Sequence, residues 1–315
     1  MDYADKRLSA RISRTLHLMY KQRMYYLLAL PGILFFLIFH YLPMYGIVIA
    51  FKKYSIFRGI ADSPWVGMAV FERLFGLSGF KRALGNTIII SFYKLITGFP
   101  LSVVAALLLN ELHSKRFNKA IQTSIILPHF ISWVVIYGIL YALLSPSAGM
   151  IGSIYKTFFP DVQVPNILAN KNAFRPLLVI TNIWRNVGFA SIMYTAAIAG
   201  IDPALYESAQ LDGAGRFQQA IHVTLPCIRS TIIIMLILRV GTILNADFEQ
   251  VLALENEIVR ETGDIIDTFV YRMGLKQAEY SLSTAAGLFK SIVAMIFVLG
   301  TNYISKKVDP DSGIF

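Results

Sequence analysis

Six long apolar runs alternate with polar segments along the chain. They cover about residues 25–51, 86–110, 121–143, 174–199, 229–248 and 283–304. A helix needs roughly 20 mainly apolar residues to cross a hydrocarbon layer about 30 Å thick, and each run reaches that length. The pattern therefore predicts an all-α membrane protein with six transmembrane helices.

A basic segment precedes the first apolar run. Within residues 5–22, apolar side chains recur at helical spacing between basic ones, at Leu8, Ile12, Leu16 and Met19. This pattern predicts an N-terminal cytoplasmic amphipathic helix in a segment of residues 1–24, and a frayed basic tail is the alternative. The first run is much longer than the apolar part of a signal peptide, and no small-x-small cleavage motif follows it. These features indicate a retained first span.

The stretch 200–228, between the fourth and fifth runs, is polar by comparison. Asp202 is placed to cap a helix whose first residue is Pro203, and Gly213 is placed to end that helix in the left-handed conformation. A second helix is predicted after the turn, and Pro226 is predicted to end it. The stretch therefore predicts a short helix, a tight turn and a second helix, which we call the elbow.

The composition supports a membrane protein and excludes several other classes. Hydrophobic residues make up 56% of the 315 residues and charged residues 15%, whereas soluble domains carry about 25% charged residues. The net charge is +10, but no basic block is typical of nucleic-acid binding, so the basic residues are assigned to segments that face anionic lipid. Cys227 is the single cysteine, which rules out an intrachain disulfide.

The distribution of Lys and Arg orients the spans. Basic residues precede the first run, fill the loop after the second and follow the sixth. The elbow, the N-terminus and the tail of residues 305–315 are therefore predicted to be cytoplasmic. The predicted outer loops are then residues 52–85, 144–173 and 249–282. The first of them opposes this rule, because it holds Lys52, Lys53, Arg58, Arg73, Lys81 and Arg82. Lys52 and Lys53 lie close enough to the first span to snorkel from it.

The order of residues in the elbow resembles a known motif. It resembles the EAA loop of binding-protein-dependent ABC importer permeases in the spacing of Glu207-Ser208-Ala209, Asp212-Gly213-Ala214 and Val223-Thr224-Leu225-Pro226. Ser208 and Val223 stand where the family usually has alanine and isoleucine, and neither changes the predicted elbow. The stretches 127–133 and 269–272 are similar to the oligosaccharide-importing subgroup of the carbohydrate-uptake class.

The resemblance covers the whole chain and implies a fold and a set of partners. The fold is that of a type I (MetI-like) ABC importer permease, with a six-span domain over residues 25–304. The implied partners are a second homologous permease, two cytosolic ATPase subunits, an extracytoplasmic solute-binding protein, an oligosaccharide substrate and membrane lipid, without nucleic acid. The implied location is the inner (cytoplasmic) membrane of a bacterium.

The EAA loop of this family is the coupling helix, which seats in a groove of the ATPase. The resemblance implies that Glu207 contacts a basic residue of the ATPase, that Gly213 permits the turn, and that Leu205, Ala209 and Phe217 form an apolar seat. The remaining coupling positions carried over from the motif are Asp212, Ala214, Leu225 and Pro226. Closure of two ATPase subunits on ATP would move this elbow and open the pathway to alternate sides of the membrane.

The chain has no sequence motif for binding or hydrolysing ATP. It lacks a G-x-x-x-x-G-K-[ST] phosphate-binding loop, a His-Glu metal motif and a Ser/His/Asp arrangement. We therefore predict a transport subunit and not an enzyme, with no cofactor or metal of its own and with ATP and Mg²⁺ on a separate ATPase chain. The alternatives are an ion-coupled secondary transporter, which would favour repeated halves, broken helices and acidic midplane residues, and an integral-membrane enzyme.

Four basic residues, Lys94, Arg185, Arg239 and Lys290, lie inside predicted spans. Each costs about 2.5–3.5 kcal/mol at the centre of a lipid-facing helix, so all four are expected to face protein or water. In one reading they pair with backbone carbonyls, with a second permease, or with the nearest acids in the spans, Asp247 and Glu249. In the other, some line a cavity for an acidic ligand such as a uronate-bearing oligosaccharide.

The same spans carry aromatic and amide side chains suited to sugars. Asn182, Trp184 and Asn186 accompany Arg185 on the fourth span, and Trp133, Tyr137 and Tyr141 recur at every fourth position of the third. Such a stripe is more often helix packing than a sugar-stacking surface. The candidate substrate pathway comprises Lys94, Trp133, Tyr137, Asn182, Trp184, Arg185, Asn186, Arg239 and Lys290.

Overall fold

The computed structural model describes residues 21–112, 114–159, 161 and 163–308. Within these residues the chain is mostly helical, and its extended pairing is limited to two isolated β-bridges, Lys52–Trp65 and Ser55–Gly59. The predicted all-α fold is therefore confirmed. The N-terminal amphipathic helix and the end of the C-terminal tail are predicted for residues that lie mainly outside the described ranges.

The described residues form α helices and shorter 3₁₀ or π helices, the latter two labelled η. The first half of the chain contains α2 (Arg23–Phe36), η1 (Leu37–Tyr41), α3 (Leu42–Met44), η2 (Tyr45–Phe51), α4 (Gly59–Asp62), α5 (Ala69–Gly76), α6 (Ser78–Asn110), α7 (Lys115–Ile126), η3 (Leu127–Phe130), α8 (Trp133–Leu144) and α9 (Met150–Phe158). The second half contains η4 (Ile167–Ala169), α10 (Lys171–Ala199), α11 (Pro203–Leu211), α12 (Arg216–Gln219), η5 (Ala220–Thr224), α13 (Leu225–Cys227), α14 (Arg229–Gly241), η6 (Ile243–Asn245), α15 (Phe248–Leu254), α16 (Arg260–Gly263), α17 (Ile266–Tyr271), η7 (Arg272–Lys276) and α18 (Tyr280–Val308).

The six predicted runs fall in six helical segments of two kinds. Three are continuous helices long and apolar enough to cross a membrane, namely Arg23–Phe51, Ser78–Asn110 and Tyr280–Lys307. Three are bent helix pairs that pass the same test together, namely Lys115–Phe130 with Trp133–Leu144, Lys171–Ala199 with Pro203–Leu211, and Arg216–Cys227 with Arg229–Gly241. The described residues thus accommodate six crossings when each bent pair counts as one.

The third predicted run, 121–143, is broken, which corrects the expectation of one straight helix. Its two halves meet at Ile131 and Ser132 with a bend of 101°. Pro128 cannot donate a backbone hydrogen bond, and Ser132 caps the new helix by accepting a hydrogen bond from the amide of Val135 (3.4 Å). A proline followed by a serine cap therefore ends one helix and starts another.

The fifth predicted run, 229–248, also differs from the expectation. Helix α14 ends at Gly241, and the chain turns at Ala246 and Asp247, whose φ angles are 39° and 65°. Residues other than glycine adopt positive φ at a cost of about 1–3 kcal/mol and need support from their surroundings. That support comes from side chains of other helices, described below, which the local sequence does not reveal.

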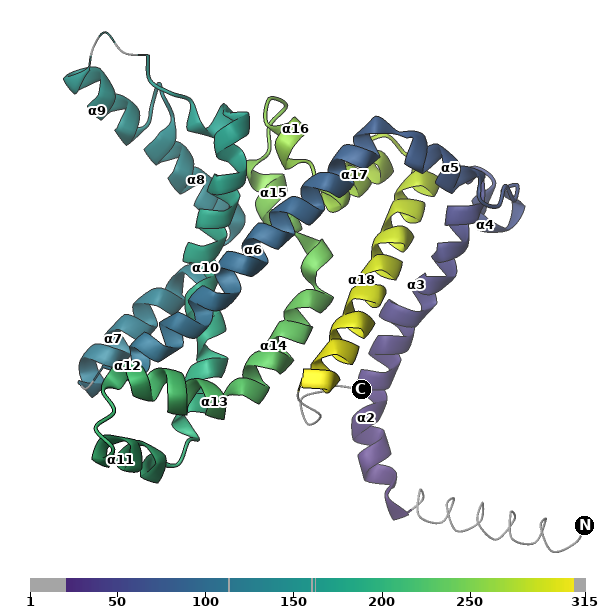
Figure 1. Cartoon of the computed structure of the whole chain (residues 1–315). Coiled ribbons are helices and arrows are strands. Elements are labelled where there is room, and N and C mark those ends of the chain that lie inside the picture. Colours follow the sequence, from purple (N-terminus) through teal and green to yellow (C-terminus); the bar gives the residue numbers. More distant parts are fainter. Residues whose placement is uncertain (1–20, 113, 160, 162, 309–315) are drawn as a thin grey trace, which may run out of the picture.

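The helices separate the two ends of the molecule (Figure 1). The elbow, formed by α11, α12 and α13, lies at one end with the start of α2, the start of α7 and the end of α18. We call this the elbow end. The helices α4, α5, α9 and α16 lie at the opposite end, and α6 and α10 pack along each other between the two.

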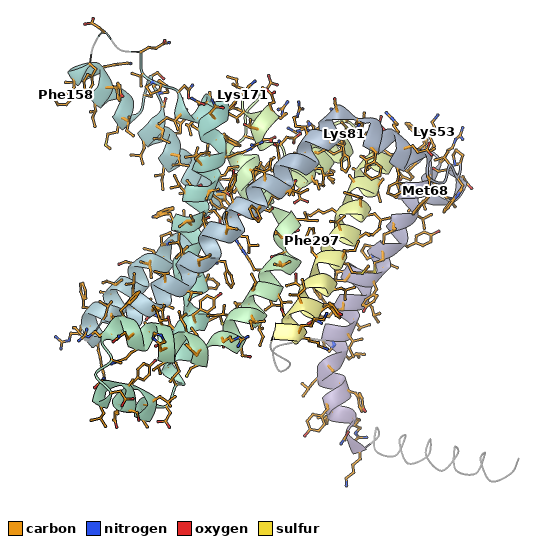
Figure 2. The ribbon with its side chains drawn as sticks, in the orientation of Figure 1. Lys53, Met68, Lys81, Phe158, Lys171 and Phe297 are labelled. Carbon is orange, nitrogen blue, oxygen red and sulfur yellow. The ribbon has the colours of Figure 1, made fainter. Side chains whose placement is uncertain are left out.

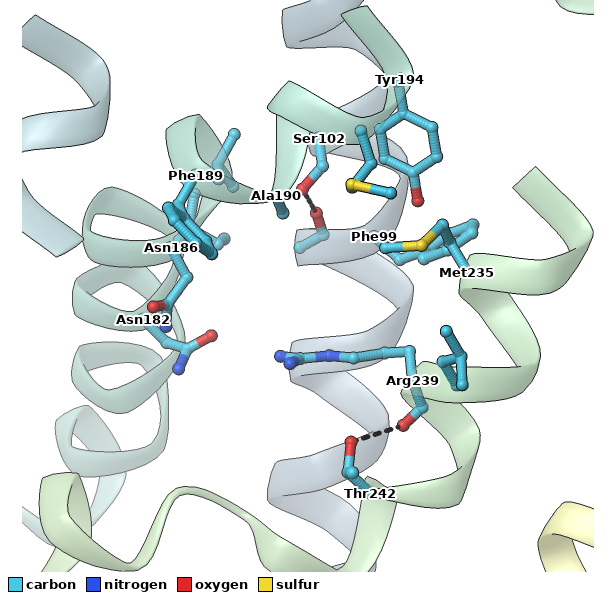
Figure 3. A pocket seen from close by; sticks show the side chains of 15 residues that line it. Phe99, Ser102, Asn182, Asn186, Phe189, Ala190, Tyr194, Met235, Arg239 and Thr242 are labelled. Carbon is cyan, nitrogen blue, oxygen red and sulfur yellow. Dashed lines mark hydrogen bonds between the residues drawn. The ribbon is translucent and has the colours of Figure 1, made fainter. Parts of the chain in front are cut away.

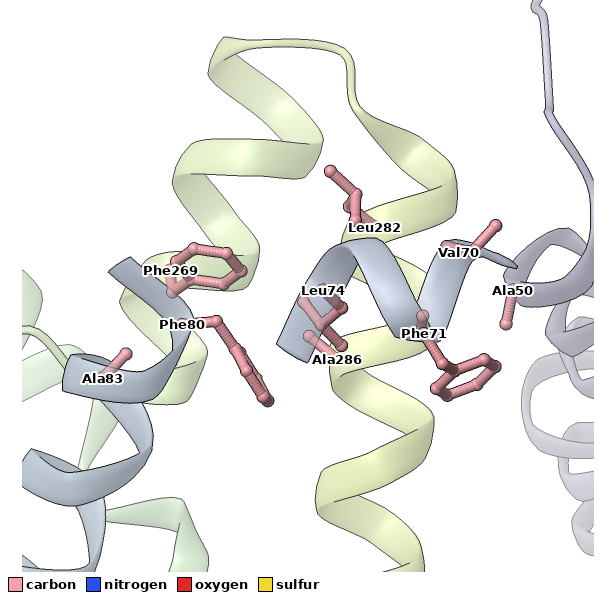
Figure 4. Close-up of a cluster of buried hydrophobic side chains, with 10 residues drawn as sticks. Ala50, Val70, Phe71, Leu74, Phe80, Ala83, Phe269, Leu282 and Ala286 are labelled. Carbon is pink, nitrogen blue, oxygen red and sulfur yellow. The ribbon is translucent and has the colours of Figure 1, made fainter. Parts of the chain in front are cut away.

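The buried core is small and the outer surface is apolar. At the end opposite the elbow, Leu74, Phe80 and Phe269 belong to a buried cluster that joins α5, α6, α17 and α18 (Figure 4). Elsewhere, side chains project outward from the helices (Figure 2). Many of the exposed side chains are apolar, among them Leu28 and Ile180. Soluble monomers rarely expose apolar patches larger than a few hundred Å², so this surface is suited to lipid and partner chains.

A buried ion pair fixes the segment between α15 and α18. The carboxylate of Asp264 is fully buried and accepts hydrogen bonds from the Arg272 guanidinium (2.5 and 3.1 Å) and from the hydroxyl of Thr268 (2.8 Å). The backbone carbonyl of Asp264 also accepts a hydrogen bond from the amide of Asn86 on α6 (3.0 Å). These contacts anchor α16 and α17 to α6.

Replacing Asp264 by alanine is expected to destabilise the protein by about 3 kcal/mol or more, because it leaves Arg272 with a half-buried and unpaired charge. Glu261→Ala is the matched control. Glu261 pairs with Lys171 at an exposed site, where solvent screens the ion pair, so its loss should change the stability little. Thermal unfolding of the purified protein in detergent should show a lower melting temperature for Asp264→Ala alone; equal shifts would contradict the assignment.

Candidate functional site: coupling elbow and central cavity

The first arm of the elbow has the predicted capping. The Asp202 carboxylate accepts a hydrogen bond from the amide of Ala204 (2.9 Å) at the start of α11. At its end, Gly213 has φ +81°, its amide donates to the carbonyl of Gln210 (3.0 Å), and the amide of Ala214 donates to that of Ala209 (2.9 Å). This pair of bonds is the Schellman arrangement that ends helices at a left-handed glycine.

The second arm begins directly after the turn. The amide of Gly215 donates to the side chain of Gln218 (2.8 Å), and the Tyr206 hydroxyl lies 2.9 Å from that of Thr224, which joins the two arms. Pro226 does not end the helix itself. The π-helical turn η5 precedes it, the helix continues to Cys227, and the chain then bends by 65° into α14.

The coupling positions predicted from the motif differ in exposure. Leu205 and Phe217 are 47% and 78% exposed, and Glu207, Asp212, Gly213 and Pro226 are exposed as well. Ala209, Ala214 and Leu225 are half-buried. Sequence reasoning does not single out Leu211, which is 90% exposed at the last position of α11. Three exposed apolar side chains on one short elbow form a surface suited to a protein groove.

A cavity lies in the middle of the helices. One part, of about 440 Å³, lies between α6, α10 and the segment after α14. It adjoins a second part of about 310 Å³ between α6, α10 and α14, and Asn182, Asn186, Phe189 and Arg239 line both. Figure 3 shows Arg239 reaching from α14 toward Asn182 and Asn186 on α10. We call the two parts the central cavity.

Lys94 supports the turn after α14 from the side of α6. The Lys94 side chain is buried, and its ammonium donates hydrogen bonds to the backbone carbonyl of Ala246 (2.8 Å) and to the side chain of Gln250. Gln250 in turn donates to the carbonyl of Leu178 and to the hydroxyl of Thr181, both on α10 (2.8 Å each). A buried cation satisfied in this way stabilises the left-handed turn at Ala246.

Asp247 joins three segments at the cavity wall. One carboxylate oxygen accepts a hydrogen bond from the indole of Trp133 on α8 (3.1 Å), and the other accepts one from the amide of Asn182 on α10 (2.9 Å). Asp247 is therefore held by neutral donors. Two of the nine side chains predicted for the pathway, Trp133 and Asn182, meet at this carboxylate.

Arg185 and His129 occupy the break in the third segment. The Arg185 guanidinium donates to the backbone carbonyl of Ile131 (3.0 Å) and lies 4.8 Å from the ring centre of Trp133, as a cation–π contact. His129 contacts Asn186 (3.0 Å) and stacks on Phe189 with ring centres 4.0 Å apart. Both side chains line the cavity while they also bind protein groups.

Arg239 differs from the other cations of the cavity. Its side chain is exposed to the cavity, and its guanidinium makes no hydrogen bond or ion pair with any residue that the structure describes. A guanidinium has five N–H donors, which a planar carboxylate matches with two parallel bonds. Arg239 is thus the cavity cation with all of its side-chain donors available to a ligand.

The structure brings together five of the nine predicted pathway residues at the cavity lining, namely Lys94, Asn182, Arg185, Asn186 and Arg239. Trp133 is buried behind Asp247, whereas Tyr137 and Trp184 are exposed away from the lining. Lys290 pairs with Asp267 of α17 (2.6 Å). The sequence indicates Asp247 and Glu249 as the acids nearest the basic residues, and it does not indicate Asp267.

The sequence does not identify two of the residues that line the central cavity. The sequence presents Asp247 only as a nearby acid and His129 as a packing residue, although both line the cavity. The stretch Leu127-Pro128-His129-Phe130, which carries the resemblance to the oligosaccharide subgroup, is the signal that marks this histidine. Within the described ranges, no three His, Cys, Asp or Glu side chains come together in a group that suits a metal ion.

Comparison with known proteins assigns the family. Residues 98–310 match the family described as binding-protein-dependent transport system inner membrane component. The chain belongs to this family. It is therefore a membrane permease subunit of an ABC importer and not an enzyme, and ATP is hydrolysed by a separate chain.

Relatives and solved structures resemble the chain over nearly its whole length. Protein LplB of Bacillus subtilis is 45% identical to this chain, and the match covers 92% of this chain and 90% of LplB. The polygalacturonan/rhamnogalacturonan transport system permease protein YteP of the same organism is 44% identical, with 94% and 91% covered.

A chain in the crystal structure of a bacterial ABC transporter involved in the import of the acidic polysaccharide alginate superposes with a TM-score of 0.86. It is 41% identical, and the match covers 94% of this chain and 99% of that one. A similar match (TM-score 0.85, 41% identical, 94% and 98% covered) is the alginate transporter in complex with an alginate pentasaccharide-bound periplasmic protein.

Proposed function

We propose that this permease imports acidic, uronate-bearing oligosaccharides through the central cavity. The observation that carries the proposal is the guanidinium of Arg239, which has no partner among the described residues and faces the amides of Asn182 and Asn186 across the cavity. Amide groups suit sugar hydroxyls, and a guanidinium suits a carboxylate. The names of two relatives, which refer to polygalacturonan/rhamnogalacturonan and to alginate, support the same substrate class.

The charge of the cavity favours an anion. Lys94, Arg185 and Arg239 line it against a single carboxylate among the described lining residues, that of Asp247. A concave site lined mainly by one sign of charge, with apolar walls, concentrates the field and raises the local concentration of a ligand of opposite charge. A neutral oligosaccharide would gain nothing from this potential.

The elbow is the proposed contact with the ATPase. Glu207, Leu205 and Phe217 are exposed on it, so that an acidic group and two apolar groups are available to a groove with a basic residue. We place the elbow, the N-terminus and the C-terminus in the cytosol, and propose residues 25–304 as the six-span domain. A second homologous permease, two ATPase subunits that bind ATP and Mg²⁺, and an extracytoplasmic solute-binding protein complete the proposed importer.

The test uses the assembled transporter in proteoliposomes with its solute-binding protein. Oligogalacturonate is expected to be taken up with ATP, and a neutral oligosaccharide of equal length at least about tenfold less well, the discrimination that one good charge-assisted contact provides. The complex should co-purify with an ATPase and a second permease. Equal uptake of both sugars would refute the acidic substrate, whereas recovery of a lone active homomer would refute the assembly.

A further inference from the structure

The predicted outer loop of residues 52–85 is basic, although basic residues are usually depleted from the outer loops of membrane proteins. Residues 52–82 hold six Lys and Arg side chains and two acidic ones, a net charge of +4. The segment lies at the end of the molecule opposite the elbow, around α4 and α5 (Figure 1). Basic residues concentrate on the cytoplasmic side of membrane proteins, so this charge requires another explanation.

A pocket lies beside this basic segment. A hollow of about 390 Å³ lies between Lys53 and Tyr54, the helix α5, and residues 278–282 at the start of α18. Two predicted outer loops, separated by more than 200 positions in sequence, thus form one surface. The third outer segment, which contains α9, projects from a different part of the same end (Figure 1).

Hydrogen bonds connect the two sides of the pocket. The amide of Tyr54 donates to the hydroxyl of Ser281 (3.0 Å), which donates to the carbonyl of Lys52 (2.6 Å). The Arg73 guanidinium forms two hydrogen bonds with the carboxylate of Glu279 (2.9 and 3.3 Å). A pocket held from both sides needs little ordering when a partner binds, which favours binding.

Two cations of this loop are available, Lys53 in the pocket lining and Arg58 five positions further along the chain. Lys53 and Arg58 are exposed, and their side chains make no hydrogen bond or ion pair with the part of the chain that the structure describes. Phe57, between them, is 99% exposed, and Trp65 is exposed nearby. Aromatic and cationic side chains together are typical of the residues that dominate protein interfaces.

We propose that this pocket, with the exposed side chains of Lys53 and Arg58, receives an acidic side chain of the solute-binding protein. The inference rests on the proposed function in taking that protein as the partner and in placing this end of the molecule outside the cytosol. A negatively charged protein surface accounts for both the retained outer charge and the pocket. Glu279 does not oppose an acidic partner, because Arg73 pairs with it. Anionic lipid headgroups would account for the charge, but not for a hollow of about 390 Å³ lined mostly by uncharged side chains.

The test measures binding of the solute-binding protein to the assembled transporter in nanodiscs by biolayer interferometry, with and without oligogalacturonate. The Lys53→Glu/Arg58→Glu variant is expected to bind about tenfold more weakly at low salt, mainly through slower association. The difference should shrink at high salt, where exposed charges are screened. The matched control is Lys156→Glu on α9, an exposed lysine of the other outer segment, which should bind like the wild type.

Unchanged binding of the double variant, or an equal loss in Lys156→Glu, would overturn the proposal. A loss that follows the phosphatidylglycerol content of the nanodisc would assign the charges to lipid and overturn it as well. Basal ATPase activity without solute-binding protein should be unaltered, which shows that the variant is assembled. A failure of the acidic-substrate proposal would change only the dependence on oligogalacturonate, so the two outcomes are distinguishable.

Discussion

Replacing Glu207 by alanine is expected to lower ATP-driven uptake at least about thirty-fold while the protein remains inserted. Glu207 is exposed on α11 and has no partner among the described residues, so its loss removes no contact within the fold. Truncating one member of a buried charge pair at an interface costs about 2–5 kcal/mol, and 2 kcal/mol corresponds to roughly thirty-fold. Uptake, stimulated ATPase activity and ATPase co-purification measure the effect.

Ser208→Ala, one position away, is the matched control. The Ser208 hydroxyl only donates to the carbonyl of Ala204 in its own helix (2.9 Å), and alanine is the residue usual in the EAA loop. This variant should transport normally. Normal uptake and normal stimulated ATPase activity in Glu207→Ala would contradict the coupling role.

The geometry of the same elbow is tested at Gly213, where valine is expected to impair coupling more than the loss of Glu207 does. The φ of +81° is unfavourable for a β-branched residue, whereas an added Cβ would meet no atom within 4 Å. The penalty therefore comes from the backbone and not from a clash. Gly213→Asn should retain most of the activity, because asparagine tolerates the left-handed region; equal losses in both variants would contradict this explanation.

Arg239→Gln is expected to lower the uptake of oligogalacturonate by about 10- to 100-fold and to leave the uptake of a neutral oligosaccharide nearly unchanged. A hydrogen bond to a charged group is worth about 1.5–3 kcal/mol, which corresponds to that range. Glutamine keeps part of the length and hydrogen bonding while it removes the charge. Initial uptake rates over a range of concentrations of the loaded solute-binding protein give the change in KM and in maximal rate separately.

Two other charge-removing variants separate binding from structure. Lys290→Gln removes a cation that pairs with Asp267 away from the cavity, so it should reduce stability without changing selectivity between acidic and neutral sugars. Arg185→Gln removes the contact with the carbonyl of Ile131 at the helix break, and should affect both sugars alike. Unchanged uptake of acidic and neutral sugars by all three variants would refute the acidic-ligand cavity.

The elbow was predictable because its signals are local. Asp202 and Pro203 start α11, and Gly213 and Ala214 end it, through bonds that span no more than five residues. Capping and turn chemistry act over this distance, so they can be read directly from sequence. The exposure of Leu211 was not predictable, because it depends on which face of α11 the rest of the chain covers.

The broken third and fifth segments were not predictable in the same way. Apolar residues continue through both, so hydropathy alone reads each as one crossing. Pro128 and Ser132 give a local signal for the first break, but the left-handed Ala246 and Asp247 have none. Lys94, Trp133 and Asn182, distant in sequence, hold that turn.

The sequence by itself determined the all-α membrane fold, the six apolar runs and the capped elbow, because hydrophobic length and turn chemistry are local properties. Only the tertiary structure decided which of the four basic side chains in the runs is available to a ligand. Lys94, Arg185 and Lys290 each bond to a group from another segment of the chain, whereas the Arg239 guanidinium has no such partner among the described residues. The physical reason is that the cost of a charge in the membrane depends on the partners that folding brings within hydrogen-bonding distance.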